Sequence, residues 1–73
     1  MNKRQIARHV TLVIAAGYDG MHLVKVYKTT DMRFTDVLYR SPMCERFEKA
    51  MQYAKDWCGE KRYHVAESYI VGV

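Results

Sequence analysis

The sequence has little of what marks exported or membrane-spanning proteins. It contains two cysteines and one proline in 73 residues, and no stretch approaches the ~20 consecutive apolar residues that cross a bilayer. The apolar run "VTLVIAAG" follows Lys3 and Arg4, but it holds a threonine and lacks the A-x-A pattern at which signal peptides are cleaved. Few cysteines and no export signal predict a cytoplasmic protein that makes no membrane contact.

Motifs for catalysis and cofactor binding are also missing from the sequence. The four glycines fit neither a Walker loop nor a dinucleotide-binding fingerprint. No pattern places two carboxylates together as a general acid and base, and His9 and His22 fall near opposite ends of a predicted hairpin. We therefore expect a protein that is not an enzyme and needs no cofactor.

The two cysteines raise the question of a metal or redox site. Cys44 and Cys58 fall in "MCERFEKAMQYAKDWCG", which we predict to be helical, and their 14-residue separation then spans roughly 21 Å. A disulfide needs Cα atoms within about 7 Å, so these two cannot pair. His64 could approach Cys58, but two ligands fall short of the four that a structural zinc site needs. The sequence therefore predicts no metal site.

A reactive Cys44 is the sharper alternative. In this helix it would lie in the first turn, where the helix dipole lowers the pKa of a thiol, with Arg46 close by. Glu45 opposes that effect, and the sequence shows neither a nearby base nor an oxyanion site. Cys58 fits a simpler role as a small core residue in the apolar stripe of the helix.

What the chain does contain is enough apolar and charged residues for one small domain. The composition, 49% hydrophobic and 27% charged, is that of a globular protein. We predict a single compact α+β domain over residues 1–73, in which residues 1–5 form a flexible basic arm. A core this small favours self-association, such as a homodimer, or a partner surface.

The net charge of +4 is unevenly distributed along the chain. Residues 1–40 carry seven basic and three acidic side chains, whereas residues 41–73 carry five of each. Such asymmetry favours an anionic partner, because the basic half attracts it from a distance. A net charge of this size also serves solubility alone, and the sequence does not separate the two explanations.

Alternating apolar residues predict a β-hairpin near the N-terminus. Residues 6–16 and 21–30 read as two strands, and the parity of their apolar positions favours a loop of three residues, 18–20. Gly20 would take the left-handed conformation that such a loop requires. One face of the hairpin then carries Val10, Leu12, Ile14, Val24 and Val26, and the other His9, Thr11, Val13, Lys25 and Tyr27.

The remaining residues predict a third strand, a helix and a fourth strand. Residues 33–40 read as a strand whose facing is ambiguous, since Phe34 and Leu38 oppose Val37 and Tyr39. Ser41 is expected to cap a helix that Gly59 ends. The helix would present an apolar stripe of Phe47, Ala50, Met51, Ala54, Trp57 and Cys58.

Residues 62–71 complete a β-β-β-α-β chain, which is a two-layer α+β fold with a mostly antiparallel sheet and one amphipathic helix packed on one face. The right-handed crossover through the helix should return the last strand beside the first and parallel to it, in the strand order 4-1-2-3.

The basic and aromatic residues of the first half suggest a nucleic-acid-binding or other polyanion-binding sheet face. Aromatic side chains on a sheet can stack on bases while lysine and arginine contact phosphates. No RNP-like motif supports this hypothesis, and tyrosine is common in strands for packing alone. The candidate residues for nucleic acid or another partner are Lys3, Arg4, Arg8, Lys25, Tyr27, Arg33, Tyr39 and Arg40.

A protein partner is the alternative to nucleic acid. The same face keeps Val13, Leu23 and Tyr27, joined by Val37 and Tyr39 in one of the two facings of the third strand. Tyrosine and arginine are frequent anchors of protein interfaces. It could close a homodimer or dock on a larger host protein. The chain would then act as a regulator or inhibitor, an accessory role like those of small phage or plasmid proteins.

Overall fold

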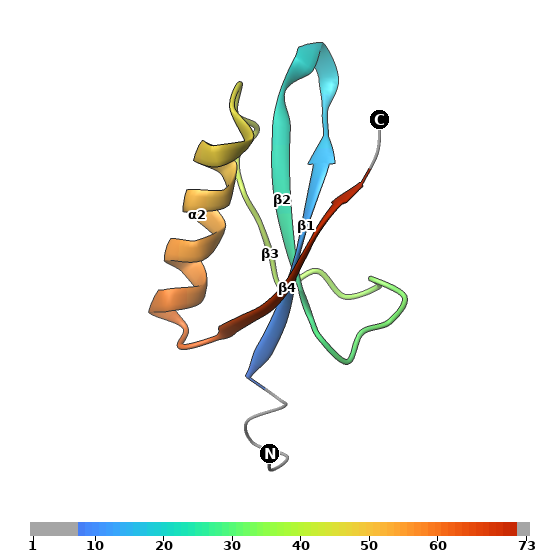
Figure 1. Cartoon of the computed structure of the whole chain (residues 1–73), viewed down its shortest axis with the longest axis vertical. Helices are drawn as coiled ribbons and strands as arrows, with labels where there is room; N and C mark the ends of the chain where they lie inside the picture. Colours follow the sequence, from blue (N-terminus) through green and yellow to red (C-terminus); the bar gives the residue numbers. More distant parts are fainter. Residues whose placement is uncertain (1–7, 72–73) are drawn as a thin grey trace.

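A four-stranded mixed sheet with one helix on one of its faces makes up the computed structural model, which describes residues 8–71 (Figure 1). The predicted basic arm, residues 1–5, lies outside the described residues. The elements are β1 (His9–Ala16), the short 3-10 helix η1 (Tyr18–Gly20), β2 (His22–Lys28), β3 (Tyr39–Arg40), α2 (Phe47–Glu60) and β4 (His64–Val71).

The sheet confirms the predicted α+β fold and its strand order. The strands lie in the order β3-β2-β1-β4, which is the 4-1-2-3 arrangement expected from the sequence. β1 pairs antiparallel with β2 and parallel with β4, and β2 pairs antiparallel with β3. The first and last strands of the described chain therefore lie side by side, with β1 as an inner strand and β4 and β3 as the two edges.

The register of the first hairpin confirms the predicted three-residue loop. Leu12 pairs with Val26 and Ile14 with Val24. The Gly17 N–H donates to the Met21 carbonyl at 2.7 Å and so closes the loop over residues 18–20. Gly20 has a φ of 73°, the left-handed conformation that glycine adopts without steric cost.

The apolar side of this hairpin forms the core, and α2 covers it. We call this side the helix face and the opposite side the outer face. Leu12, Val24 and Val26 are fully buried on the helix face. Ala50, Ala54 and Cys58 recur every four residues along α2 and are buried against them, as the predicted stripe requires.

The third predicted strand is much shorter than expected. Only Tyr39–Arg40 pairs with β2, and residues 29–38 leave the sheet as a loop, which we call the covering segment. The Asp31 carboxylate holds this loop, because it accepts N–H bonds from Thr35, at 3.0 Å, and from Asp36, at 2.9 Å. These bonds, led by that from Asp36, lower the pKa of Asp31. The local hydrogen bonds thus outweigh the β-propensity of the segment.

The start of the helix also differs from the prediction. Residues 41–44 continue along the edge of β2 instead of forming a first turn, and Ser41 is buried there, not at a helix cap. The Ser41 Oγ accepts the Val24 N–H at 2.8 Å, and the Ser41 N–H donates to the Val24 carbonyl at 2.9 Å. Cys44 likewise forms a two-way main-chain bridge with His22. The Ser-Pro pattern was misleading because these bonds to β2 require an extended chain.

The helix ends after Gly59, not at it. Gly59 lies inside α2, and Arg62 takes the left-handed conformation with a φ of 60°. The Arg62 N–H donates to the Gly59 carbonyl and the Tyr63 N–H to the Cys58 carbonyl, which together form a Schellman motif. This turn directs the chain into β4.

Candidate binding surfaces

The outer face of the sheet, where a partner was expected, is partly closed. The covering segment folds back over it, so the segment and α2 lie on opposite sides of the hairpin (Figure 1). The rings of Tyr27 and Phe34 pack with their centroids 5.1 Å apart, and Tyr27 is only 6% exposed. Thr11 and Val13 are also buried on this face. A base could stack on Tyr27 only if the covering segment moved away.

A hollow of about 650 Å³ remains between the covering segment and β4. Its size falls within the range of sites that take a small ligand or a side chain of a protein partner. Most of the lining is apolar, and Asp31 and Glu67 add two carboxylates. The lining residues are Thr11, Thr29, Asp31, Met32, Phe34, Glu67, Tyr69, Ile70 and Val71.

Thr29 gives this hollow an unsatisfied polar group. Its Oγ1 is buried and has no hydrogen-bond partner within the described part of the chain. A buried hydroxyl without a partner costs free energy, so such groups are uncommon in folded proteins. Thr29 is also one of the residues that line the hollow.

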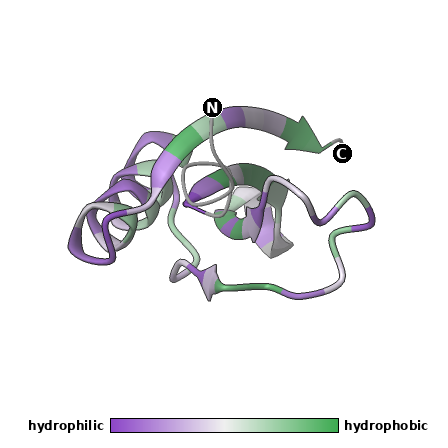
Figure 2. Ribbon diagram, turned by 90° about the horizontal axis from the view of Figure 1, so that it is seen from below, coloured by the Kyte–Doolittle hydropathy of each residue, from purple (hydrophilic) through white to green (hydrophobic). Residues whose placement is uncertain are grey.

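Exposed apolar side chains gather around the hollow. Met32 is 84% exposed and Ile70 is 76% exposed. Phe34, Tyr69 and Val71 are each between two fifths and one half exposed. The last residues of β4, beside the C-terminus, are coloured as hydrophobic in Figure 2. A group of this kind on a small domain is typical of a surface that contacts another molecule.

The predicted basic and aromatic residues do not form one surface. Lys25 and Arg40 are cross-strand neighbours on the outer face, and Arg33 is exposed in the covering segment. Tyr27 is on the same face but buried. Tyr39 pairs with Val26 and thus lies on the helix face. The facing of the third strand, which the sequence left open, therefore does not place Tyr39 on the outer face. Lys3 and Arg4 lie outside the described residues.

Tyr39 instead belongs to a stack of aromatic rings beside the helix. Its ring lies 5.1 Å from that of Trp57, which in turn lies 5.5 Å from Tyr63. The Arg8 guanidinium sits 5.6 Å from the centre of the Tyr63 ring. Burial, followed by the charges of nearby side chains including Glu60, raises the pKa of Tyr39. The rings already use their faces on one another, so this stack stabilises the packing of α2.

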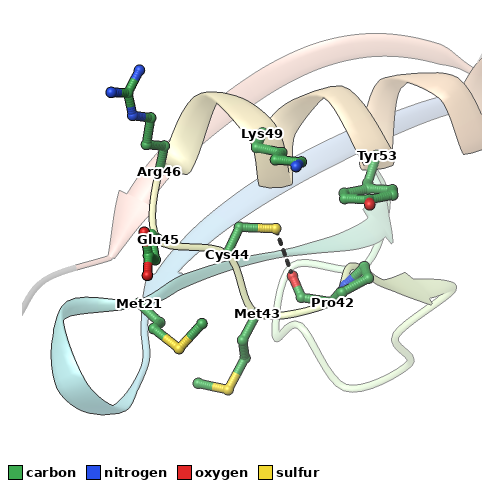
Figure 3. Close-up of a pocket in the computed structure, with 8 residues that line it drawn as sticks. All are labelled: Met21, Pro42, Met43, Cys44, Glu45, Arg46, Lys49 and Tyr53. Atoms are coloured by element: carbon green, nitrogen blue, oxygen red, sulfur yellow. Dashed lines mark hydrogen bonds between the residues drawn. The ribbon is translucent and has the colours of Figure 1, made fainter.

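Cys44 lines a second, more polar hollow of about 470 Å³ at the junction of β2 and α2 (Figure 3). Its thiol donates to the Pro42 carbonyl at 3.4 Å, and the side chains of Met21 and Met43 extend to the other side of the chain. Cys44 therefore does not lie in the first helical turn, and the expected effect of the helix dipole is lost. The bridge to His22 makes an imidazole its neighbour, which the sequence did not indicate.

The arrangement around Cys44 lacks the features of a nucleophile. The His22 ring packs edge-on against Phe47, with centroids 6.3 Å apart, and Cys44 is only 8% exposed. Cys58 is more deeply buried, and burial raises the pKa of its thiol. Both cysteines are free thiols.

Metal ligands do not gather in the part of the chain that the structure describes. Among residues 8–71, no three His, Cys, Asp or Glu side chains converge on one point. The His9 and His64 rings lie side by side at the start of β1 and β4, with centroids 4.9 Å apart. Within the same range, no helix has both the length and the apolar character to cross a bilayer.

The hollow beside β4 was missed from the sequence for an identifiable reason. Its walls come from the covering segment, which was expected to be a strand, and from β4, which was expected to be an ordinary edge. Met32 in a turn and the run "YIV" at residues 69–71 were the only signals available. Neither predicts a hollow until the covering segment is known to fold over the outer face.

Comparison with protein-family models, with curated proteins and with solved structures finds no match to this chain.

Proposed function

We propose that this chain is a small non-catalytic binding protein that acts on a larger protein as a regulator or inhibitor. The observation that carries the proposal is the apolar hollow between the covering segment and β4, with five exposed apolar side chains around it. An apolar side chain of the partner would enter the hollow and remove this surface from water.

The charges around the hollow favour a protein over a nucleic acid at this place. Asp31 and Glu67 are the charged residues of its lining, and both are acidic. Carboxylates repel phosphates, whereas they can pair with lysine or arginine at the rim of a protein interface. The Asp31 carboxylate is already engaged by Thr35 and Asp36, which leaves Glu67 as the charge more available to a partner.

Two exposed apolar residues of the covering segment provide a matched test. Met32→Glu places a charge in the hollow, whereas Val37→Glu makes the same kind of change at a residue outside the hollow lining. Each variant and the wild type would be used to capture proteins from host lysate, with quantitative mass spectrometry. We expect a partner that the wild type and Val37→Glu retain and that Met32→Glu loses. Equal capture by all three proteins, or no partner at all, would contradict the proposal.

Nucleic-acid binding is the second candidate, and one observation favours it. Lys25 and Arg40 pair across β2 and β3 on the outer face, and Lys28 is exposed at the end of β2. These residues lie on the opposite edge of the sheet from β4, so the two candidates use different surfaces.

Fluorescence anisotropy with labelled single-stranded DNA, duplex DNA and RNA tests this second candidate. Lys25→Ala and Arg40→Ala should each weaken binding and flatten its dependence on salt, because each removes a phosphate contact. Binding that disappears at physiological salt, or that both variants retain in full, would show that the charge serves solubility.

A further inference from the structure

We propose that two copies of this chain pair through β4, antiparallel, and so join their sheets into one. This inference goes beyond the proposed function and does not rest on it, because it concerns the free edge of β4 and not the hollow. The two surfaces share Ile70, which also lines the hollow, so Met32 tests the hollow and Ser68 tests the edge.

The main-chain groups of β4 alternate between the two sides of the strand. The His64 N–H donates to the Arg8 carbonyl at 2.7 Å, so the main chain of His64 faces β1. One extra residue follows, because Val10 pairs with Val65 but Thr11 pairs with Glu67. Beyond this bulge the alternation is shifted by one, so the N–H and C=O groups of Ser68 and Ile70 point away from the sheet.

The pairing of β1 with β2 supports this assignment. The Thr29 N–H donates to the His9 carbonyl, and the Gly17 N–H to the Met21 carbonyl, so odd-numbered residues of β1 face β2. Even-numbered residues, including Leu12, therefore face β4. Leu12 is opposite Ser68, and in a parallel pair it bonds to the residues on either side of Ser68. The main chain of Ser68 is thus left free to pair with another strand.

Natural proteins usually protect such an edge, and β4 has only one common form of protection, the bulge before Glu67, which leaves the residues from Glu67 to Val71 in regular register with β1. Prolines, lysines and inward-pointing charges block the pairing of edge strands. β4 reads HVAESYIV and contains no proline, lysine or arginine, and Glu67 is its one acidic residue. Seven of its eight residues are exposed. The strand spans roughly 26 Å, which is long for an open edge.

We expect the partner strand to be β4 of a second copy, because the side chains of β4 complement those of an antiparallel β4. In a two-fold register centred on Ser68, Ser68 exchanges main-chain bonds with its own copy, Glu67 lies opposite Tyr69, and Ile70 lies opposite Ala66 at the bulge. The Tyr69 hydroxyl already donates to the Glu67 carboxylate at 3.0 Å within one chain, so the two groups match chemically across the axis. Neither Glu67 meets the other directly, and the cross-strand pair Lys25 and Arg40 lies at the far edge of the sheet.

The strength of this association should be modest. Pairing of one strand buries less than the about 1,200 Å² of a standard stable interface, so we expect a dissociation constant on the order of micromolar. The exposed Ile70 side chains would be covered against Ala66 of the other copy, which adds apolar burial to the main-chain bonds.

Sedimentation equilibrium over about 1 to 300 µM tests the proposal. We expect the wild type to shift from monomer to dimer across this range. Ser68→Pro removes an outward N–H without removing a bond to β1, and Ile70→Lys adds a charge at the edge; both should stay monomeric. Val37→Lys, an equivalent change on the covering segment, and Met32→Glu, in the hollow, should dimerise like the wild type. Circular dichroism would verify that each variant is folded. If Ser68→Pro does not fold, Ile70→Lys still tests the edge.

Oxidative crosslinking tests the register itself. Ser68→Cys should form a disulfide-linked dimer, because residues directly opposite in an antiparallel pair lie within reach of a disulfide. Lys55→Cys, on the exposed side of α2, should not, and the native Cys44 and Cys58 are buried.

Three results would overturn the proposal. The first is a wild type that stays monomeric at the highest concentration, and the second is a dimer that survives both β4 variants. The third is equal crosslinking of the two cysteine variants. A monomeric wild type whose partner binding is lost in Ser68→Pro would assign the edge to a foreign strand instead.

Discussion

The two edges of the sheet differ in how their main-chain groups are satisfied. At the β3 edge, the chain from Leu38 to Cys44 follows β2 for much of its length, and a serine side chain completes the bonding where the strand is irregular. At the β4 edge, eight residues with a single bulge pair on one side only. The β3 edge thus pairs with β2 through a short and irregular segment, whereas β4 pairs with β1 along nearly its whole length.

This difference shows that a short edge strand need not be the place where a small sheet is available for contact. β3 has two residues and looks weak, but Pro42 follows it closely and Arg40 is exposed on it, both of which discourage pairing. β4 is four times as long and has neither. The edge more available to another chain is therefore the longer one.

The largest expected effect is a difference in stability between substitutions of two serines, one at each edge of the sheet. Ser41→Ala removes the buried acceptor of the Val24 N–H and should lower the free energy of unfolding by about 1–3 kcal/mol. Ser68→Ala changes an exposed side chain and should stay within about 0.5 kcal/mol of the wild type. Urea unfolding below the dimerisation range measures both, and equal losses would show that the two edges are satisfied alike.

The second prediction concerns the turn that leads into β4. Arg62→Gly relieves a left-handed residue at the end of α2 and should raise the free energy of unfolding by about 0.5–1 kcal/mol. Gly59→Ala should also stabilise the protein, by up to about 1 kcal/mol, because Gly59 is helical and a Cβ there meets no atom within 4 Å.

These two substitutions move the glycine to the position where the structure needs it. If Gly59 were instead the left-handed cap that the sequence suggested, Gly59→Ala would destabilise the protein. Thermal unfolding of the single and double variants distinguishes the two cases, and the double variant should combine both gains because the changes act on different backbone positions.

A smaller effect should follow from loosening the covering segment. Asp31→Ala removes the acceptor of the Thr35 and Asp36 N–H groups, so the exchange of these amide hydrogens should become faster, while exchange in β1 stays slow. The pKa of Asp31 is lower in the folded than in the unfolded state. The ionised carboxylate therefore stabilises the fold at pH values above the usual carboxyl pKa, and this stabilisation is lost as the pH falls below it. Acid should therefore reproduce the effect of the variant in the wild type. Unchanged exchange at Thr35 in both experiments would contradict this account.

The smallest effect compares two tyrosines, one near each edge. The pKa of Tyr39 is raised mainly by burial, and that of Tyr69 mainly by its hydrogen bond to Glu67. Glu67→Gln should therefore bring the pKa of Tyr69 back towards 10 and leave that of Tyr39 raised, as measured by NMR titration. Because both pKa values are higher in the folded state, the protonated tyrosines stabilise the fold. The free energy of unfolding should therefore decline as the pH rises above about 10. A Tyr69 pKa that does not respond to Glu67→Gln would contradict the assigned cause.

The sequence predicted the parts of the fold that depend on periodic burial. The parity of Val10, Leu12 and Ile14 against Val24 and Val26 defined the hairpin register, because a shift of one residue would expose every one of these side chains. The stripe along α2 and the return of β4 beside β1 followed from the same logic. In each case burial outweighs any local preference.

The sequence did not predict the segments where local hydrogen bonds compete with periodicity. Residues 33–38 have the composition of a strand, but the Asp31 carboxylate holds a loop there. Ser41 has the position of a helix cap, but its hydroxyl bonds to β2 instead. A short polar side chain can satisfy a turn, a cap or a neighbouring strand, and only the three-dimensional fold decides which.

The candidate surface was predicted only in part for the same reason. Lys25 and Arg40 do share the outer face, because strand parity places them there. The burial of Tyr27 under Phe34 and the stacking of Tyr39 on Trp57 depend on the covering segment and on the short β3. Neither element could be placed from its own residues.

The parallel pairing of β1 with β4 has a consequence for the protein as it is made. β1 ends at Ala16, but its second neighbour begins only at His64. At a synthesis rate of about 5–20 residues per second, the ribosome needs several seconds to produce the residues between them. During that time Leu12 and Ile14 lack part of their final cover, and one side of the future central strand is unpaired. The first strand to be translated is thus the last to be completed, so folding has to wait for nearly the whole described chain and should then proceed in a single step.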